Sequence, residues 1–326
     1  MANERTNAVD LMKLQEVAIR IREMRDICGF TVAEMAEKTE VSAEEYMAYE
    51  AGKLDFPFSF IHKCALAFDI GITDLLEGRS ANLLSSIRTG AIPGVATKYL
   101  QREGASVLGI IGTGVVSRSC ILAIKETMKD LKEVRAYDLF FDKAEKFAKE
   151  MGEEIGIEIT PVKTMKEAVD GCDIVSVAAS GLKPVDIEDE WIKPGAVIIC
   201  TGAAMFSKEA LLKHNVVFDN WKMHKDWLDE LRDDPERLLG VNAGHPSAKL
   251  LLMVAHGEVD PNHMISFGDV LADQANLGRK SDKDVFIFLT GGMGTEDVAW
   301  GYDVYTNALK LGLGKKLTLW DKPHWA

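Results

Sequence analysis

The 326-residue chain has 47% hydrophobic and 27% charged residues, the balance of a globular protein long enough for two domains. Its net charge of −13 disfavours non-specific binding to nucleic acid, and it has no apolar run of the roughly 18 residues that a membrane span needs. The N-terminus has no secretion signal and the five cysteines form no CxxC pair, so we expect a cytoplasmic protein without a structural disulfide or metal site.

Residues 1–79 indicate a small all-α domain without strands. Gly29 ends the first expected helix, and Thr31 and Ser42 are N-caps of the next two, each followed three residues later by the glutamate of a capping box. The tight turn between the second and third helices predicts a helix-turn-helix. Apolar spacing and caps place the helices at residues 11–27, 31–39, 42–52, 57–68 and 73–78.

The start of the third helix is the candidate DNA-contacting segment. The stretch IREMRDICGFTVAEMAEKTEVSAEEYMAYEAGK resembles the Cro/C1-type (XRE) repressor family, whose third helix enters the major groove. Glutamates there repel phosphates, so two interpretations stay open: DNA binding through residues 31–53, or a protein-interaction or dimerisation module that has lost it. By resemblance, the contacts would come from Ser42, Ala43, Glu44, Glu45 and Tyr46.

A buried strand, a glycine turn and a helix follow in SVLGIIGTGVVSRSCILAIKETM, from Ser106. The turn is a GxGxxG-type fingerprint with Ser117 at the third glycine position. Gly112 permits the tight turn, and Gly114 lets a pyrophosphate approach the helix N-terminus. The alternative is a plain strand–helix turn. The expected cofactor contacts are Gly112, Thr113, Gly114, Val115 and Val116.

A second strand, EVRAYD, ends at Asp138, slightly beyond the usual spacing of about 20 residues from the glycine turn. An acid at this place accepts a hydrogen bond from the ribose 2′-hydroxyl and repels a 2′-phosphate. The sequence therefore favours NAD over NADP.

Strands and helices continue to alternate as far as residue 220, with strands expected over 157–162, 172–180, 193–202 and 214–220. This order predicts an α/β fold over residues 80–326, a Rossmann-type doubly wound parallel sheet. Ligands bind beyond the carboxyl ends of such strands. Small residues at those ends are candidates for the nicotinamide side, or else simple turn residues: Ala179, Ser180, Thr201 and Gly202.

RTGAIPGVATKYL before the glycine turn and TGGMGTEDVAWGYDVYTNALKLGLG near the C-terminus carry a family resemblance. Residues 81–326 resemble the ornithine cyclodeaminase/mu-crystallin family, closest to its tyramine oxidase branch. The resemblance implies a tightly bound nicotinamide cofactor and a small amino-acid or imine substrate. In the cyclodeaminases the cofactor takes a hydride from the α-carbon, the side-chain amine attacks the imine, ammonia leaves, and the hydride returns.

The resemblance also gives roles to three residues. Arg88 would hold the substrate carboxylate with its planar fork, and Thr89 would reach the cofactor phosphates. Asp297, beside Glu296, belongs to the segment that closes over the nicotinamide. The structural alternatives are a surface or helix-capping arginine and a first-turn acid that stabilises the helix dipole.

Two departures from the family pattern weaken this assignment. The family's N-terminal substrate half, with its lysine, second arginine and dimer surface, is replaced by the helix-turn-helix. The catalytic aspartate after the fifth strand has no counterpart in residues 201–205. The titratable groups nearby are Lys208, Asp219 and His224, of which His224 is the candidate for acid–base work.

Two functions remain open. One is an NAD(H)-dependent oxidoreductase or deaminating lyase fused to a helix-turn-helix head. The other is an NAD(H)- or metabolite-responsive transcriptional regulator without turnover. A homodimer is compatible with both, because both families commonly pair.

Overall fold

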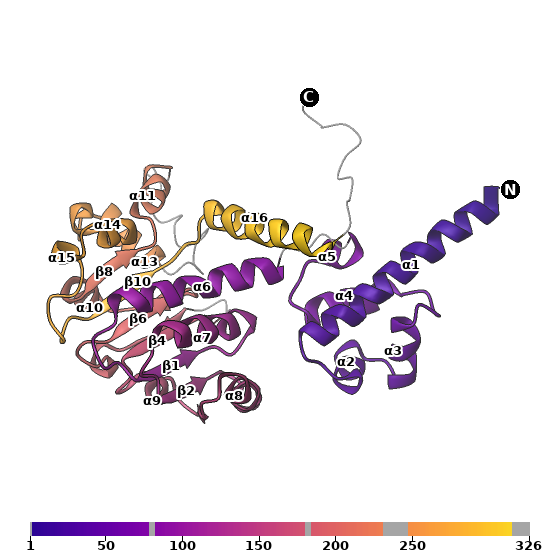
Figure 1. Ribbon diagram of the computed structural model, residues 1–326, viewed down its shortest axis with the longest axis horizontal. Coiled ribbons are helices and arrows are strands. Elements are labelled where there is room, and N and C mark those ends of the chain that lie inside the picture. Colours follow the sequence, from indigo (N-terminus) through magenta and orange to yellow (C-terminus); the bar gives the residue numbers. More distant parts are fainter. Residues whose placement is uncertain (1, 78–81, 180–183, 231–246, 315–326) are drawn as a thin grey trace. The chain divides into compact units, whose positions relative to one another are not determined.

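The computed structural model describes residues 2–77, 82–179, 184–230 and 247–314 (Figure 1). The chain divides into two compact units, Met1–Leu83 and Leu84–Ala326. The predicted boundary at 79/80 falls outside the described residues and stays a prediction. Among the described helices, none combines the length and apolar character that a bilayer span requires.

The first unit is helical throughout its described part, as predicted. Its first helix begins nine residues earlier than the apolar pattern indicated, because residues 2–10 are polar and carry no helical periodicity. Gly29 follows this helix with a φ of 69°. The helices are α1 (Ala2–Ile27), α2 (Val32–Thr39), α3 (Ala43–Glu50), α4 (Phe58–Ala67) and α5 (Ile72–Glu77).

The caps of α2 and α3 differ from each other. The Thr31 side chain accepts from the Glu34 amide, and Glu34 accepts in return from the Thr31 amide, which confirms this capping box. Ser42 accepts from the Glu45 amide, but the carboxylate of Glu45 accepts from the Tyr49 hydroxyl at 2.8 Å. The second predicted box was therefore wrong in its reciprocal half, because Tyr49, one turn along α3, takes the carboxylate.

The second unit is built on one sheet. Eight described strands run in the order β3-β2-β1-β4-β6-β10-β8-β9, and every pairing is parallel. The predicted doubly wound α/β fold is confirmed. The strands are β1 (Val107–Ile111), β2 (Glu133–Tyr137), β3 (Ile159–Val162), β4 (Ile174–Val177), β6 (Val197–Cys200), β8 (Asn215–Phe218), β9 (Ile265–Ser266) and β10 (Phe286–Leu289), with a separate pair, β5 (Val185–Asp186) and β7 (Ala204–Met205).

Helices cover both faces of the sheet (Figure 1). One core lies under α6, α7, α8 and α14, and the other under α9, α10 and α13, with alternate strand residues such as Ile110 and Ile111 entering opposite cores. The helices are α6 (Asn82–Leu100), α7 (Val115–Thr127), α8 (Phe141–Ile155), α9 (Met165–Val169), α10 (Lys208–Lys213), α11 (Trp221–Glu230), α13 (Ala248–Ala255), α14 (Phe267–Ala272), α15 (Gln274–Leu277) and α16 (Gly294–Leu311).

Two glycines let α6 lie directly on α7. A Cβ added at Gly90 would lie 2.2 Å from the Ser119 Cβ, and one at Gly94 would lie 2.7 Å from the Ala123 oxygen. The two helices therefore run side by side in the same direction. Arg88, two residues before Gly90, is directed toward the α7 end that follows the glycine turn.

Candidate functional site

The glycine turn connects β1 to α7 at the carboxyl edge of the sheet. Gly112 has a φ of 85°, and Ser117 donates through its hydroxyl to the Gly112 oxygen at 2.6 Å. Gly114 is the N-cap of α7 and offers no side chain to cap it, and a Cβ built there finds no atom within 4 Å. An uncapped helix N-terminus beneath open space fits a pyrophosphate, so these residues fit the cofactor that the fold implies.

Asp138 lies beside this turn. Its Oδ2 accepts from the Thr113 amide at 3.0 Å and from the Thr113 hydroxyl at 2.9 Å, while Oδ1 accepts from the Phe140 amide at 3.1 Å. These bonds fix the carboxylate at the tip of β2. Oδ1 keeps a lone pair, because a carboxylate oxygen can accept two hydrogen bonds.

The small residues at the strand ends converge on the same edge. Ala179 packs against both Gly112 and Gly202, where an added Cβ would approach its backbone to 2.7 and 2.6 Å. The Thr201 hydroxyl donates to the Val177 oxygen at 2.9 Å, which ties β6 to β4. The candidate Ser180 lies outside the described residues.

Asp219, just after β8, is a buried anchor at this edge. Its Oδ2 accepts from the amides of Gly291 and Gly292 at 2.7 and 2.8 Å, and from the Thr290 hydroxyl at 2.9 Å. Its Oδ1 accepts from the Asn220 amide at 2.7 Å. This one carboxylate therefore holds the backbone that leads from β10 into α16.

His224 completes the anchor from α11. Its Nε2 lies 3.1 Å from Asp219 Oδ1, and its Nδ1 lies 3.0 Å from the Ser247 hydroxyl. The ring is fully buried and packs against Phe218 and Trp227. The order Ser–His–Asp resembles a catalytic triad, but a buried serine has no access to substrate. These contacts favour a supporting role for His224 over the catalytic one predicted.

The pKa of Asp219 reflects these donors. Burial alone would raise the pKa of the carboxyl, but the hydrogen bonds from His224, Gly292 and Asn220 outweigh burial and lower it to about 2. Asp219 is therefore a permanent anion rather than a proton carrier near neutral pH.

Arg88 and Asp297 meet at the N-terminus of α16. Nε and Nη2 of Arg88 donate to the two carboxylate oxygens of Asp297 at 2.8 and 3.1 Å, and Nη1 lies 3.4 Å from Oε2 of Glu296. The same Glu296 oxygen accepts from the Met293 amide, while burial raises the pKa of the Glu296 carboxyl. The structure thus brings together the two ends of the family motif, and Thr89 is half-buried beside them in sequence.

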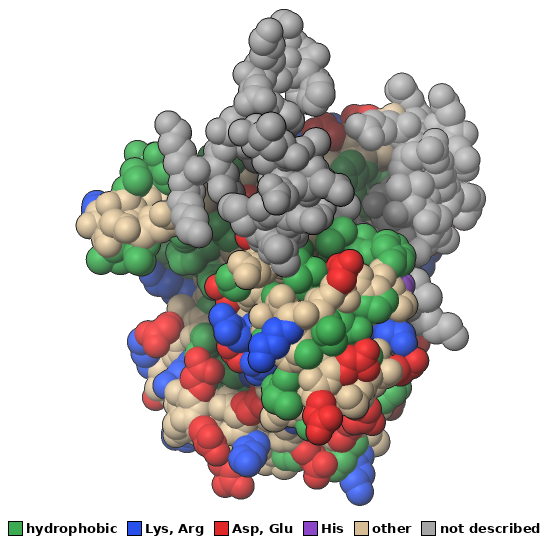
Figure 2. Space-filling view, turned by 90° about the vertical axis from the view of Figure 1, so that its right-hand side faces the viewer, with side chains coloured by type: hydrophobic (Ala, Val, Ile, Leu, Met, Phe, Trp, Pro, Cys, Tyr) green, Lys and Arg blue, Asp and Glu red, His purple; other side chains and the backbone are tan. Residues whose placement is uncertain are grey.

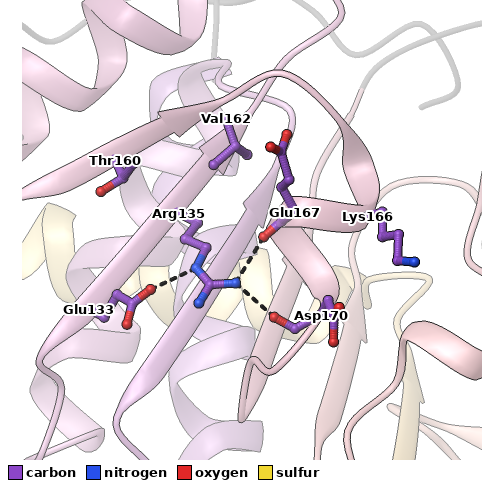
Figure 3. Close-up of a pocket in the computed structure, with 7 residues that line it drawn as sticks. All are labelled: Glu133, Arg135, Thr160, Val162, Lys166, Glu167 and Asp170. Carbon is purple, nitrogen blue, oxygen red and sulfur yellow. Dashed lines mark hydrogen bonds and ion pairs between the residues drawn. The ribbon is translucent and has the colours of Figure 1, made fainter.

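A hollow of about 500 Å³ lies elsewhere, over β2, β3 and α9 (Figure 3). Arg135 crosses it and donates to the Glu133 carboxylate at 2.7 Å and to the carbonyl oxygens of Glu167 and Asp170 at 3.1 and 2.7 Å. Because this guanidinium already satisfies the carbonyls that end α9, the hollow serves the fold rather than a ligand. Within the described ranges, no group of three or more His, Cys, Asp or Glu side chains is arranged to hold a metal ion.

The helix-turn-helix surface differs from expectation at one residue. Ser42, Ala43 and Glu44 are exposed at the start of α3, but Tyr46 is fully buried in the head's core. Its side chain therefore packs the helices together instead of facing a DNA groove. α3 is only eight residues long, which left its apolar face undetermined by periodicity.

The charges around α3 are mixed. Lys38 and Lys53 are exposed, whereas Arg25 is bound to Glu50 at 2.6 Å. On the face that Figure 2 displays, the coloured basic and acidic side chains are interspersed.

Family models match both parts of the chain. The ornithine cyclodeaminase/mu-crystallin model covers residues 70–312, and a helix-turn-helix domain model covers residues 18–80. The chain is 32% identical over 242 residues to the alanine dehydrogenase of Archaeoglobus fulgidus, covering 73% of this chain and 67% of that protein.

Solved structures agree. The Thermococcus litoralis Delta(1)-pyrroline-2-carboxylate reductase, in complex with NADH and L-proline, has a TM-score of 0.60 and 28% identity, over 73% of this chain and 68% of that one. An archaeal alanine dehydrogenase dimer with bound NAD has a TM-score of 0.59 and 29% identity, over 74% and 69%. The chain thus spans about two thirds of these relatives. It belongs to the ornithine cyclodeaminase/mu-crystallin family, with a helix-turn-helix domain at its N-terminal end.

Proposed function

We propose that the protein is an NAD(H)-dependent oxidoreductase or deaminating lyase acting on a small amino acid or imine. The observation that carries this proposal is the uncapped N-terminus of α7 under Gly114, with Asp138 fixed beside it. NAD(H), when bound, would supply or accept the hydride. The relatives with NAD or NADH bound support this cofactor.

In this proposal the chain's residues divide the cofactor between them. The amides that open α7, at Val115 and Val116, receive the pyrophosphate. Asp138 Oδ1 accepts from the ribose hydroxyl and repels a 2′-phosphate. Ala179, Thr201 and Gly202 leave room for the nicotinamide at the carboxyl ends of β4 and β6, the position at which parallel sheets bind ligands.

Arg88 is the proposed substrate grip. A guanidinium has five N–H donors, and Asp297 takes the side formed by Nε and Nη2. The end formed by Nη1 and Nη2 remains able to bind a second carboxylate at two points, with Glu296 at its margin. Asp297 then orients Arg88 for the substrate instead of competing with it.

NADH fluorescence of the purified full-length chain tests the cofactor step. We expect binding that Gly114→Ala abolishes, since this substitution meets no neighbouring atom yet fills the space over the helix N-terminus. A panel of amino acids, cyclic imine carboxylates, and 2-keto acids with ammonium would then reveal turnover. An Asp297→Asn variant should raise KM for the carboxylate substrate more than it lowers kcat.

The alternative function, an NAD(H)-responsive DNA-binding regulator, is favoured by the helix-turn-helix match at residues 18–80. Tight NADH binding without turnover on any substrate would favour it over the enzyme. Gel shifts on a random DNA pool, repeated at rising salt, test the head directly, and Glu44→Lys should strengthen any complex. If low salt gives no shift, the DNA proposal fails, and if NADH does not bind, both functions fail.

A further inference from the structure

Helix α16 is built unlike the other long helices of its unit (yellow in Figure 1). It has 18 residues, and none of them is buried. A helix of this length draws its stability in water mostly from packing an apolar face, because propensity alone leaves it marginal. Its glycines and β-branched residues lower that propensity further.

Four large apolar side chains form a line along α16. Val298, Tyr302, Tyr305 and Leu309 are spaced by four, three and four residues, the a/d spacing of a heptad. Their exposed fractions are 73%, 65%, 59% and 60%. We call these four residues the α16 seam.

The residues that flank the seam are small and uncharged. With Tyr302 at position a, the neighbouring e and g positions are filled by Ala299, Gly301, Thr306 and Ala308. The charged residues Asp303 and Lys310 fall on the sides of the helix. Two helices can therefore approach closely along the seam without charge repulsion at the contact.

We propose that the α16 seam is the contact surface of a homodimer, in which α16 packs antiparallel on α16 of a second copy. In this register, Val298 lies level with Leu309 of the second copy, and Tyr302 lies level with Tyr305. Each apolar layer then joins an a position to a d position, and the seam is complementary to itself, as a two-fold interface requires.

Charge supports the antiparallel direction. The N-terminal turn of α16 carries Glu296 and Asp297, and its last turn carries Lys310. Antiparallel packing brings the basic end of one helix level with the acidic end of the other, and it also opposes their dipoles favourably. A parallel pair would place like ends together in a chain whose net charge is already −13.

Sedimentation velocity of the full-length chain over a range of concentrations tests the proposal. One helix per copy makes a small interface, so we expect a concentration-dependent dimer. Tyr305→Glu and Leu309→Glu should each raise its dissociation constant by about tenfold or more, because they place a charge in an apolar seam. Asn307→Glu, which adds the same charge to an exposed position off the seam, should leave the dimer unchanged.

Cysteine cross-linking tests the direction independently of affinity. The double variant Val298→Cys/Leu309→Cys should form disulfide-linked dimers on mild oxidation, whereas either single variant should not. The wild-type chain is the blank, since four of its five cysteines are buried and Cys28 is half-buried. The proposal is overturned by a chain that stays monomeric, by a dimer that the seam variants do not weaken, or by cross-linking of a single variant.

Discussion

Arg88 and Asp297, 209 positions apart, form a two-point ion pair with donor–acceptor distances of 2.8 and 3.1 Å. One lies in α6 beside the helix that follows the glycine turn, and the other opens α16. The arginine side chain is 14% exposed and the aspartate 39%, so the pair is only partly screened by solvent. It links two segments that carry the family motif and that have no other common support among the hydrogen bonds described.

This pairing predicts a measurable coupling. Arg88→Ala should lower the free energy of unfolding of the second unit by about 2 kcal/mol, because it leaves two half-buried carboxylates without a partner. Asp297→Ala should cost less, since Arg88 keeps Glu296. The double variant should reveal about 1 kcal/mol of coupling in a mutant cycle.

Tryptophan fluorescence during urea unfolding provides the measurement, since all six tryptophans lie beyond residue 190 and report on the second unit. Lys98→Ala, an exposed cation on the same helix α6, is the control and should be nearly neutral. A coupling energy of zero would show that the pair contributes nothing to the fold.

Asp138 should determine the choice of cofactor. Asp138→Ala removes both an acceptor for the ribose hydroxyl and a charge that repels a 2′-phosphate, so NADH should bind about tenfold more weakly while NADPH loses less. Titrations of both cofactors, followed by fluorescence, check the ratio. Asp142→Ala, an exposed acid in the first turn of α8, controls for net charge. An unchanged NADH-to-NADPH ratio in the Asp138 variant would remove it from the cofactor site.

Local patterns in the sequence predicted the local structure well. The glycine turn, the strands on either side of it and the Thr31 cap depend on residues close together in the chain, and all lie where expected. The strand β10 was missed, although Phe286–Leu289 is a continuous apolar run. Its place between β6 and β8 depends on pairing over long sequence distances, which periodicity does not encode.

The candidate site shows the same limit. Arg88 and Asp297 are each recognisable from their own motif, but nothing in the sequence links them to each other. Asp219 gives little sign of its role in the sequence, because its five donors come from three segments that only the fold brings together. An acid directly after a buried strand was the available signal, because such ends meet at one edge of a parallel sheet.

Gly90 and Gly94 should be required for packing rather than for flexibility. Gly90→Ala would place its Cβ 2.2 Å from that of Ser119, so α6 must move away from α7. We expect a loss of about 2 kcal/mol in the free energy of unfolding, together with weaker NADH binding as Arg88 and the glycine turn separate. Gly268→Ala, where a Cβ meets open space, is the matched control. Equal stability of the two variants would contradict the close contact.

Asp219 should make the second unit sensitive to acid. Its folded-state pKa of about 2 lies below the ordinary aspartate value of 3.8, so the ionised carboxylate stabilises the fold above about pH 4. That contribution, on the order of 2 kcal/mol, should disappear as the pH falls from about 4 toward 2. Asp219→Asn should be less stable at pH 7 and should lack this part of the acid dependence, because its amide does not titrate.

The measurement is urea unfolding at a series of pH values, followed by tryptophan fluorescence. Asp226→Asn, an exposed acid on the same helix α11, should keep the wild-type pH dependence. Asp219→Asn should also loosen the Thr290–Gly292 backbone, since the three donors there lose their anion. If the variant keeps both its stability at pH 7 and the wild-type slope below pH 4, Asp219 does not anchor the segment that leads into α16.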